Sequence, residues 1–375
     1  YSHIKPMKIA FLISSLSKGG AEGVAAGLCN SWQTAGHTVD ILTFQTNDEI
    51  IGYELCEGIN LHPLALMKES HSVLKFLQNN IIKIFNLRRR LKAIAPDVLV
   101  AFVTDINIIA IIASCGLSIP VIISERVHPG AHKVESIHNL LRKYIYPWAH
   151  TLVVQTQDIA VWVKTNLNMQ AEVVANPVRE PKFRRQAHVD SRNKIIAVGR
   201  FTRQKGFDLL IEAFSNISNN FPDWELTIFG NGPERASLER QVRLANLSES
   251  VHLPGQSLEI AKEISMADIY VHPARYEGFP NSLLEALAGG LCCIGTDSPG
   301  GVAEILKNGE FGFVIESENI DELAKTLSIV MTNETLREQY AHKAPLAING
   351  FTPEIIARKW ISILENAQNS FDVKN

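Results

Sequence analysis

The fold is decided at residues 194–207, where the sequence reads Lys194-Ile-Ile-Ala-Val-Gly-Arg-Phe-Thr-Arg-Gln-Lys-Gly-Phe207. The apolar run up to Val198 predicts a buried strand, Gly199 opens a loop, and a helical pattern follows from Phe207. The same order of strand, glycine-containing loop and helix opens the chain near Lys8. A pattern that starts twice predicts two domains of similar architecture.

Short apolar runs alternate with helical patterns on both sides of this restart. They predict strands at 8–14, 39–44, 98–103, 121–123 and 152–154, and then at 194–198, 225–229, 251–253, 269–272, 291–294 and 313–315. Continuous apolar strands between helices are typical of a parallel sheet covered on both faces. We therefore expect an α/β protein whose two Rossmann-like, doubly wound parallel-sheet domains face a central cleft.

The length of 375 residues also favours two domains, which we place at 7–180 and 188–350. Between them, residues 176–186 are polar, basic and proline-containing, as expected of a linker. A last helix, about 353–369, is expected to pack back on the first domain. The most apolar stretch, 106–123, is interrupted by polar residues, glycine and proline, so it predicts a buried helix and strand rather than a membrane span.

The net charge of −3 is spread unevenly along the chain. Residues 7–187 carry +4 and residues 188–375 carry −8, with Lys5 as the remainder. A basic first half is expected to face an anionic partner. The negative total and the lack of a basic-aromatic array argue against nucleic acid. Five cysteines without metal-ligand spacing predict reduced thiols, a cytoplasmic location and no metal site.

The stretch Pro273-Ala-Arg-Tyr-Glu-Gly-Phe-Pro-Asn-Ser-Leu-Leu-Glu285 carries the strongest chemical signal. It predicts a strand end, a loop and a helix whose N-terminus suits a phosphate. Glu277 precedes this helix and Glu285 lies inside it, and ionised carboxylates accept hydrogen bonds from hydroxyl groups. A phosphate between two polyols is the outline of a nucleotide-sugar. The alternative is one capping glutamate and one ion-paired helical glutamate.

Three other loops follow predicted strands, where ligands bind in such folds. Arg200 and Lys205 could neutralise a diphosphate, or could belong to a solvated basic loop. Gly19-Gly20 would let the backbone approach a ligand closely, although the spacing is not the dinucleotide fingerprint. Glu125, Arg126 and His128 are candidates for orienting an acceptor or donor sugar; a lone loop histidine is alternatively solvated or capping.

Together these residues resemble the retaining glycosyltransferase family 4, which has the GT-B fold. The most specific element, Glu277-Gly-Phe-Pro-Asn-Ser-Leu-Leu-Glu285, matches the family's E-x7-E motif. Further matches are Gly199-Arg200, Lys205-Gly206-Phe207-Asp208, Gly19-Gly20-Ala21-Glu22 and Gly230-Asn231-Gly232-Pro233.

The resemblance implies a role for each residue. Arg200 and Lys205 would hold the donor diphosphate, Glu285 the ribose and Glu277 the transferred sugar. Gly20 and the segment Gly278, Phe279, Asn281, Ser282 and Leu283 would contact the donor, mainly through the backbone. Catalysis would fall to Glu277 with Glu125, Arg126 or His128. The family retains the anomeric configuration and requires no metal or cofactor besides the nucleotide-sugar. A GT-B epimerase remains the alternative, although it should lack the Gly19–Glu22 motif.

The acceptor is indicated by a long basic amphipathic pattern at 73–94. Lys83, Arg88, Arg89 and Arg90 could contact a diphosphate headgroup or an anionic membrane surface. The alternative is an ordinary core-facing helix. This region resembles bacterial enzymes that extend lipid-diphosphate-linked oligosaccharides, such as the GalNAc transferase of the N-glycosylation pathway. The resemblance implies transfer of a hexose or N-acetylhexosamine, from UDP, to a polyprenyl-diphosphate-linked glycan at the inner face of the membrane; a soluble acceptor stays open.

Overall fold

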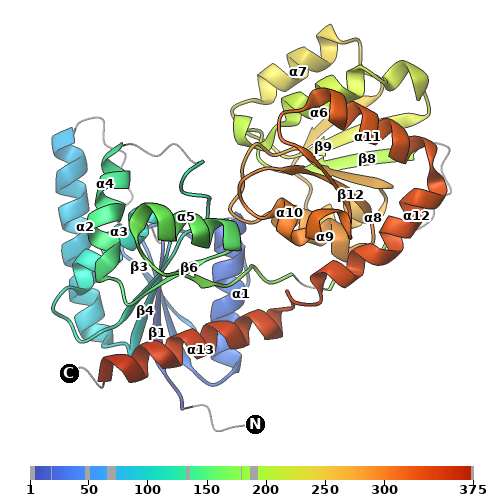
Figure 1. Ribbon diagram of the computed structural model, residues 1–375. Coiled ribbons are helices and arrows are strands. Elements are labelled where there is room, and N and C mark those ends of the chain that lie inside the picture. The colour runs from blue at the N-terminus through green and yellow to red at the C-terminus, as the bar shows by residue number, and fades with distance from the viewer. Residues whose placement is uncertain are drawn as a thin grey trace. The chain divides into compact units, whose positions relative to one another are not determined.

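The computed structural model describes residues 5–17, 19–46, 51–65, 73–131, 136–178, 180–185 and 193–372. The chain divides into two compact units. Unit 1 runs to Pro177 and resumes at Pro353, and unit 2 is the continuous segment Val178–Thr352. Each unit is a parallel sheet with helices on both faces (Figure 1). The two predicted α/β domains are confirmed.

Unit 1 contains a seven-stranded sheet in the order β3-β2-β1-β4-β5-β6-β7, with every neighbouring pair parallel. Its strands are β1 (Lys8–Ile13), β2 (Thr38–Thr43), β3 (Asn60–Pro63), β4 (Val98–Phe102), β5 (Val121–Ser124), β6 (Thr151–Val154) and β7 (Glu172–Val173). Its helices are α1 (Gly20–Thr34), α2 (Val73–Ile94), α3 (Thr104–Ser114), α4 (Ser136–Ile145), α5 (Gln157–Leu167) and α13 (Pro353–Asp372).

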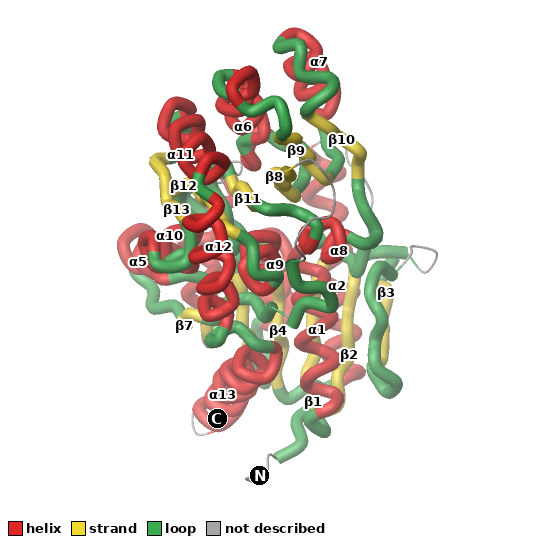
Figure 2. The backbone as a smooth tube through the Cα atoms, turned by 90° about the vertical axis from the view of Figure 1, so that its right-hand side faces the viewer, coloured by secondary structure: helices red, strands yellow, loops and turns green. Residues whose placement is uncertain are grey.

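The last helix, α13, completes the core of unit 1. Its residues Ile356, Trp360 and Leu364 are buried against α1 and the sheet, where the Trp360 ring meets Trp32 edge-on at 6.1 Å. Figure 2 shows α13 and α1 within the same unit as β1, β2 and β4. An aromatic side chain of this size buries enough apolar surface to tie the C-terminal segment to the first half of the chain.

Unit 2 contains a six-stranded parallel sheet in the order β10-β9-β8-β11-β12-β13. Its strands are β8 (Asn193–Val198), β9 (Trp224–Phe229), β10 (Val251–Gly255), β11 (Ile269–His272), β12 (Cys292–Asp297) and β13 (Phe313–Glu316). Its helices are α6 (Phe207–Ser215), α7 (Arg235–Leu244), α8 (Ile260–Ser265), α9 (Asn281–Ala288), α10 (Val302–Ile305), α11 (Ile320–Thr332) and α12 (Glu334–Lys343).

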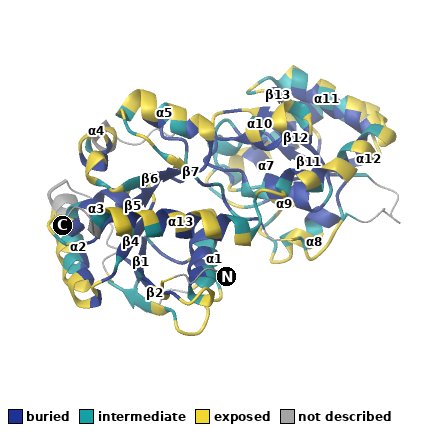
Figure 3. Cartoon of the chain, turned by 60° about the horizontal axis from the view of Figure 1, so that its bottom comes forward, coloured by how far each residue is buried: buried dark blue, intermediate teal, exposed yellow. Residues whose placement is uncertain are grey.

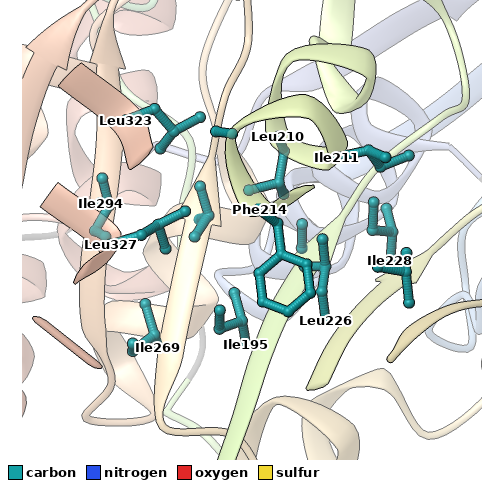
Figure 4. Packing of buried hydrophobic residues seen from close by; sticks show 14 of the residues in the cluster. Ile195, Leu210, Ile211, Phe214, Leu226, Ile228, Ile269, Ile294, Leu323 and Leu327 are labelled. Carbon is teal, nitrogen blue, oxygen red and sulfur yellow. The ribbon is translucent and has the colours of Figure 1, made fainter. Parts of the chain in front are cut away.

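Apolar side chains on one face of this second sheet form a continuous core with α6 and α11 (Figure 4). Leu210 and Phe214 from α6, and Leu323 and Leu327 from α11, belong to the same buried cluster as the strand residues Ile195 and Ile294. Helical residues spaced three or four apart lie on one face, which explains the placement of both pairs. Figure 3 shows the same division throughout the chain, with buried strands and helices that are exposed on their outer sides.

The strand order reverses between β1 and β4 in unit 1 and between β8 and β11 in unit 2. Ligands of such sheets bind beyond the carboxyl ends of the strands at the reversal point. In unit 2 the loop after β8 carries Arg200 and Lys205, and the loop after β11 carries Glu277. The topology therefore brings the two most informative sequence motifs to one edge of one sheet.

Every predicted strand occurs, and 106–123 is the helix α3 followed by β5, as expected. Within the described residues, no helix is long and apolar enough to span a membrane. Two short strands escaped prediction. The strand β3 is partly exposed and lacks a continuous apolar run, and β7 is two residues long. Neither has the periodicity by which strands are recognised.

Candidate active site

The loops after β8 and β11 are joined to each other by hydrogen bonds. The Arg275 N–H donates to the Gln204 carbonyl at 2.8 Å, and the Gln204 side-chain amide donates to the Tyr276 carbonyl at 3.0 Å. At Gly206, φ is +67°, and an added Cβ would lie 2.0 Å from the Pro273 carbonyl oxygen. Only glycine fits such a backbone conformation at such a close approach.

The Arg275 side chain joins the same two loops a second time. Its guanidinium makes a bidentate ion pair with Asp208, at 2.8 and 2.7 Å, and also donates to the Arg203 carbonyl at 2.8 Å and to Glu318 at 2.6 Å. Partial burial of Asp208 opposes its ionisation, but Arg275 outweighs it and holds the pKa of that carboxyl below its usual value. Bidentate pairs fix geometry as well as charge, so Arg275 holds the position of the loop that carries Lys205.

Glu277 is a buried carboxylate with two donors. Lys205 Nζ and His272 Nε2 both contact its Oε1, His272 at 3.0 Å. Burial alone would raise the pKa of Glu277, but Lys205 and then His272 lower it to about 2. Glu277 is therefore ionised at neutral pH, and the predicted phosphate-binding and sugar-binding residues form an ion pair with each other.

A third loop, which follows β12, fixes the backbone of Glu277. The Glu277 N–H donates to the Pro299 carbonyl at 2.7 Å. Gly300 has φ +115°, and a Cβ there would lie 2.1 Å from the Glu277 carbonyl oxygen. The position of this carboxylate is thus set by three neighbouring strands, which is the arrangement a preorganised site needs.

The helix α9 begins directly after this loop. Pro280 is its N-cap and supplies no side-chain cap, and the Leu283 N–H donates to the Pro280 carbonyl at 3.0 Å. The Asn281 N–H donates to the Phe279 carbonyl, also at 3.0 Å. Two of the N–H groups predicted to contact the donor therefore have partners in local turns. Gly278 and Phe279 are buried beside them.

Two predicted donor-binding side chains are exposed and have no partner among the described residues. Arg200 lies two residues after the end of β8 and makes no ion pair with any residue that the structure describes. Glu285 is exposed on α9, and loss of water around its carboxyl still raises its pKa. An unpaired cation and an unpaired carboxylate beside the Lys205–Glu277 pair are groups that can accept a ligand without first breaking an internal contact.

In unit 1, Glu125 lies inside the protein, just beyond β5. Its carboxylate accepts hydrogen bonds from Arg142 Nε at 2.9 Å, from Thr104 Oγ1 at 3.0 Å and from the Tyr146 hydroxyl. The Glu125 and Arg142 side chains are 3% and 2% exposed. All these contacts are internal, so the observed role of Glu125 is to hold α3 and α4 against the strand, and a catalytic role stays a prediction.

Arg126 is buried at the same strand end. Its guanidinium lies 4.3 Å from the centre of the Phe102 ring and donates to Asn176, which also accepts from Gln155 at 2.8 Å. Its Nε has no partner among the described residues. Burial lowers the pKa of Arg126, and the nearby Glu22 opposes this effect. The Gly19–Glu22 motif and the Glu125–His128 motif therefore meet at the carboxyl edge of the first sheet.

His128 is also largely buried. Its Nδ1 accepts from the Gly130 N–H at 3.2 Å, and its Nε2 lies 3.4 Å from Asp158 at the start of α5. Burial lowers its pKa and Asp158 partly restores it. Because Nδ1 is an acceptor, neutral His128 carries its proton on Nε2. The ring thereby links its own loop to α5.

Gly20 is exposed and is the first residue of α1, and Lys18 lies outside the described residues. The turn before it is held by Tyr53, whose hydroxyl accepts from the Gly19 N–H at 2.9 Å and donates to the Gly19 carbonyl at 2.5 Å. This helix has no side-chain cap at its N-terminus. A contact of this backbone with the donor stays a prediction.

The four basic residues of α2 do not behave alike. Arg88 donates to the carbonyls of Ala113 and Cys115, at 2.9 and 2.6 Å, and so caps the C-terminal end of α3. Lys83 lies 5.4 Å from the centre of the Phe44 ring. Arg89 and Arg90 are exposed. Of these four residues, only Arg89 and Arg90 make no hydrogen bond or ring contact within the described part of unit 1. The side chains of Lys75, Phe76 and Leu77 lie outside the described part.

Sequence reasoning missed the residues that support the site. The sequence pattern places His272 at a strand end and Arg275 in a loop, and it singles out neither Arg142 nor Tyr146. The sequence did contain a signal for Arg275. An arginine two residues before the predicted sugar-binding Glu277 is more simply explained by an ion pair in the site than by exposure to solvent. The partners Asp208 and Glu125 are 67 and 17 residues away from their arginines, and such pairings require the fold.

Known protein families match both units. Residues 178–346 match the family model described as Glycosyl transferases group 1, and residues 19–178 match the Glycosyl transferase 4-like domain. The chain is 25% identical, over 97% of its own length and 100% of the relative's, to an alpha-1,4-N-acetyl-D-galactosaminyltransferase of Campylobacter jejuni, whose name specifies a GalNAc-containing PP-undecaprenol acceptor.

Solved structures of similar fold agree. Sucrose-phosphate synthase from Thermosynechococcus elongatus superimposes with a TM-score of 0.86 at 16% identity, covering 96% of this chain and 99% of that one. Anabaena HepE in complex with UDP and glucose gives 0.78 at 16% identity, with the same coverage. The fold is GT-B, and the chain is a glycosyltransferase.

Proposed function

We propose that this glycosyltransferase transfers a hexose or N-acetylhexosamine from a UDP-sugar, with retention, to a lipid-diphosphate-linked glycan. The observation that carries the donor half is the pairing of Lys205 with the buried Glu277 beside an unpaired, exposed Arg200. When the diphosphate arrives, two cations are available within one loop. Fixed cations stabilise the negative charge that develops on a departing diphosphate.

The roles within unit 2 follow from this arrangement. Arg200 and Lys205 bind the diphosphate, Glu285 accepts from the ribose hydroxyls, and Glu277 accepts from the transferred sugar. The two carboxylates are suited to sugar hydroxyl groups because an ionised carboxylate accepts hydrogen bonds and donates none. The UDP in the HepE complex supports a uridine donor. Metal and cofactor are not required in this proposal, because Arg200 and Lys205 supply the positive charge.

The evidence for the proposed acceptor comes from one side of unit 1. Large apolar side chains are exposed on α2, on α4 and just after α4, with Phe85 67%, Tyr144 63% and Trp148 65% exposed. Both helices pack on α3 and lie close together in Figure 1. Arg89 and Arg90 are exposed on the same α2. Aromatic and basic groups together suit the interface of an anionic membrane, where a polyprenyl-linked acceptor is found. The named acceptor of the C. jejuni relative supports the same class.

The donor is tested by measuring the thermal stability of the protein with UDP-, GDP- and ADP-sugars. We expect UDP-sugars alone to raise the melting temperature, since a ligand stabilises the state it binds. Mass spectrometry and NMR of the product then identify the linkage. An inverted anomeric centre in the product contradicts retention, and stabilisation only by GDP- or ADP-sugars contradicts the UDP assignment.

The acceptor is tested with vesicles that contain anionic lipid. Binding should weaken as salt rises and in the double variant Arg89→Ala/Arg90→Ala, because surface charges are screened. The matched control is Arg240→Ala/Arg243→Ala, which removes two arginines from α7 in unit 2. Equal loss in both double variants, or binding that ignores salt, contradicts the membrane contact. Transfer to a short soluble acceptor at an undiminished rate would favour a soluble substrate.

A further inference from the structure

The residue that the proposed roles leave unexplained is His272, the last residue of β11. Its side chain is 2% exposed, and its Nε2 lies 3.0 Å from Oε1 of Glu277. A buried polar side chain beside a reactive carboxylate is costly unless it makes a needed contact. It is therefore the strongest candidate for a further function in this part of the molecule.

The two oxygens of Glu277 are used differently. Both Lys205 and His272 contact Oε1, whereas Oε2 has no hydrogen-bond partner among the described residues. One oxygen is thus held by the protein, and the other is left for a ligand hydroxyl. A carboxylate can serve in both ways because it has about four acceptor positions.

We propose that His272 is a positioning residue: it keeps Glu277 in place when Lys205 turns to the donor diphosphate, so that Oε2 stays aimed at the transferred sugar. This proposal rests on the donor roles given above. Glu277 has two hydrogen-bond donors in the structure, Lys205 and His272, so it keeps one of them if Lys205 moves to the diphosphate. A buried carboxylate without any partner is strongly destabilising, so Glu277 would hold Lys205 more tightly if His272 were absent.

The surroundings of His272 fix its ring. Glu277 is ionised, so neutral His272 must carry its proton on Nε2 in order to donate. Its Nδ1 lies 3.4 Å from the Tyr270 hydroxyl, which donates to Ser282 Oγ at 2.7 Å. Ser282 donates in turn to the Val198 carbonyl at 3.3 Å. Because the Tyr270 proton goes to Ser282 and Nδ1 carries none, Tyr270 touches the histidine ring by packing and not by a hydrogen bond. Tyr270 is itself held, through Ser282, at the start of α9 and the end of β8, two places that the donor is proposed to contact.

The proposal predicts that the effect of His272 depends on the charge of residue 277. In His272→Phe, UDP should bind roughly 10- to 100-fold more weakly, the factor for losing a hydrogen bond to a charged group. In the Glu277→Gln background the same change should have little effect on UDP binding, since no carboxylate is left unpaired. A histidine that merely fills space would weaken binding by the same factor in both backgrounds.

Substitutions of His272 separate hydrogen bonding from packing. Gln places its amide N–H where Nε2–H was and should restore much of kcat, whereas Asn places it near Nδ1 and should not. The matched control is His252→Phe, a change at an exposed histidine on β10. Equal loss of kcat in His272→Gln, His272→Asn and His272→Phe overturns the proposal, as does a UDP effect that is the same with and without the Glu277 charge.

One measurement needs no donor and therefore separates this proposal from the proposed function. The imidazole ¹⁵N shifts of His272 should report the Nε2–H tautomer in the unliganded protein at neutral pH. The Nδ1–H tautomer overturns the positioning role even if UDP binds. If the wild-type protein binds no UDP but shows the expected tautomer, the donor assignment fails while the contact between His272 and Glu277 is retained.

Discussion

Arg275 and Asp208 form a bidentate ion pair, at 2.8 and 2.7 Å, that joins the loop after β11 to the first turn of α6. Neither residue is proposed to touch a substrate. Their pair fixes the distance between the segment that presents Lys205 and the segment that presents Glu277. The precision of the donor site therefore depends on a contact at its margin.

Arg275→Lys should lower kcat/KM by about 100-fold, because a single ammonium cannot reproduce the two parallel hydrogen bonds and small displacements at a site are costly. Steady-state kinetics with a UDP-sugar measures this effect. Arg235→Lys, which alters a half-buried pair with Glu239 on α7 and a hydrogen bond to the Leu253 carbonyl, is the control and should leave kcat/KM nearly unchanged. Equal rates for wild type and Arg275→Lys would show that the pair does not position the site.

Protonation of Glu277 at low pH should lower the free energy of unfolding. The pKa of Glu277 is lowered from its ordinary 4.5 to about 2 in the folded protein, so its contribution to stability is complete above about pH 4.5 and is lost as the pH falls toward 2. The full contribution is on the order of 3 kcal/mol. Urea unfolding at pH 6, 4.5 and 3.5 measures it. Glu277→Gln should lose less stability over this range, and an identical pH dependence would refute the assignment.

Arg200 is predicted to matter for binding and not for folding. Because it is exposed and unpaired, Arg200→Ala should change the free energy of unfolding by less than about 0.5 kcal/mol. UDP affinity should fall roughly 10- to 100-fold, as for loss of a charged hydrogen bond. Calorimetric titration with UDP measures the change, with Arg203→Ala as the neighbouring exposed control. Unchanged affinity in Arg200→Ala would remove it from the donor site.

Glu125 should behave as a structural carboxylate. Glu125→Gln leaves Arg142 buried without its ion-pair partner, and such breaks cost about 3–5 kcal/mol. The double variant Glu125→Gln/Arg142→Met should recover part of this loss, because no buried charge then remains unpaired. Urea unfolding measures both. A large fall in kcat with unchanged stability would instead favour the catalytic role predicted from the sequence.

The sequence was sufficient for the fold because its signals are local. The buried strands β4 and β11 are continuous apolar runs, and the turn at Gly199 separates a strand from a helix within a few residues. Periodicity and turn residues report on such features directly. The strand β7, with only two residues, has no such pattern and was found only in the structure.

The site was predictable only where its residues lie in one motif. Glu277 and Glu285 stand in a single loop and helix, so their spacing carries information. The contact of Glu277 with Lys205 spans 72 positions, and that of Glu125 with Tyr146 spans 21. Burial and pairing of this kind arise when strands β8 and β11, or β5 and α4, come together. Burial and ion pairing decide whether a carboxylate can contact a substrate or is already bound by other side chains of the protein.

The return of α13 to unit 1 has a consequence for synthesis on the ribosome. Unit 2 is continuous in sequence, so all of it has been translated before Pro353 is added. Unit 1 still lacks Trp360 and Leu364 at that moment, and both belong to its buried core. Domains usually fold in the order in which they emerge. Here the core of unit 1 is completed only by the last helix, and unit 2, which is proposed to bind the donor, is the first to be complete.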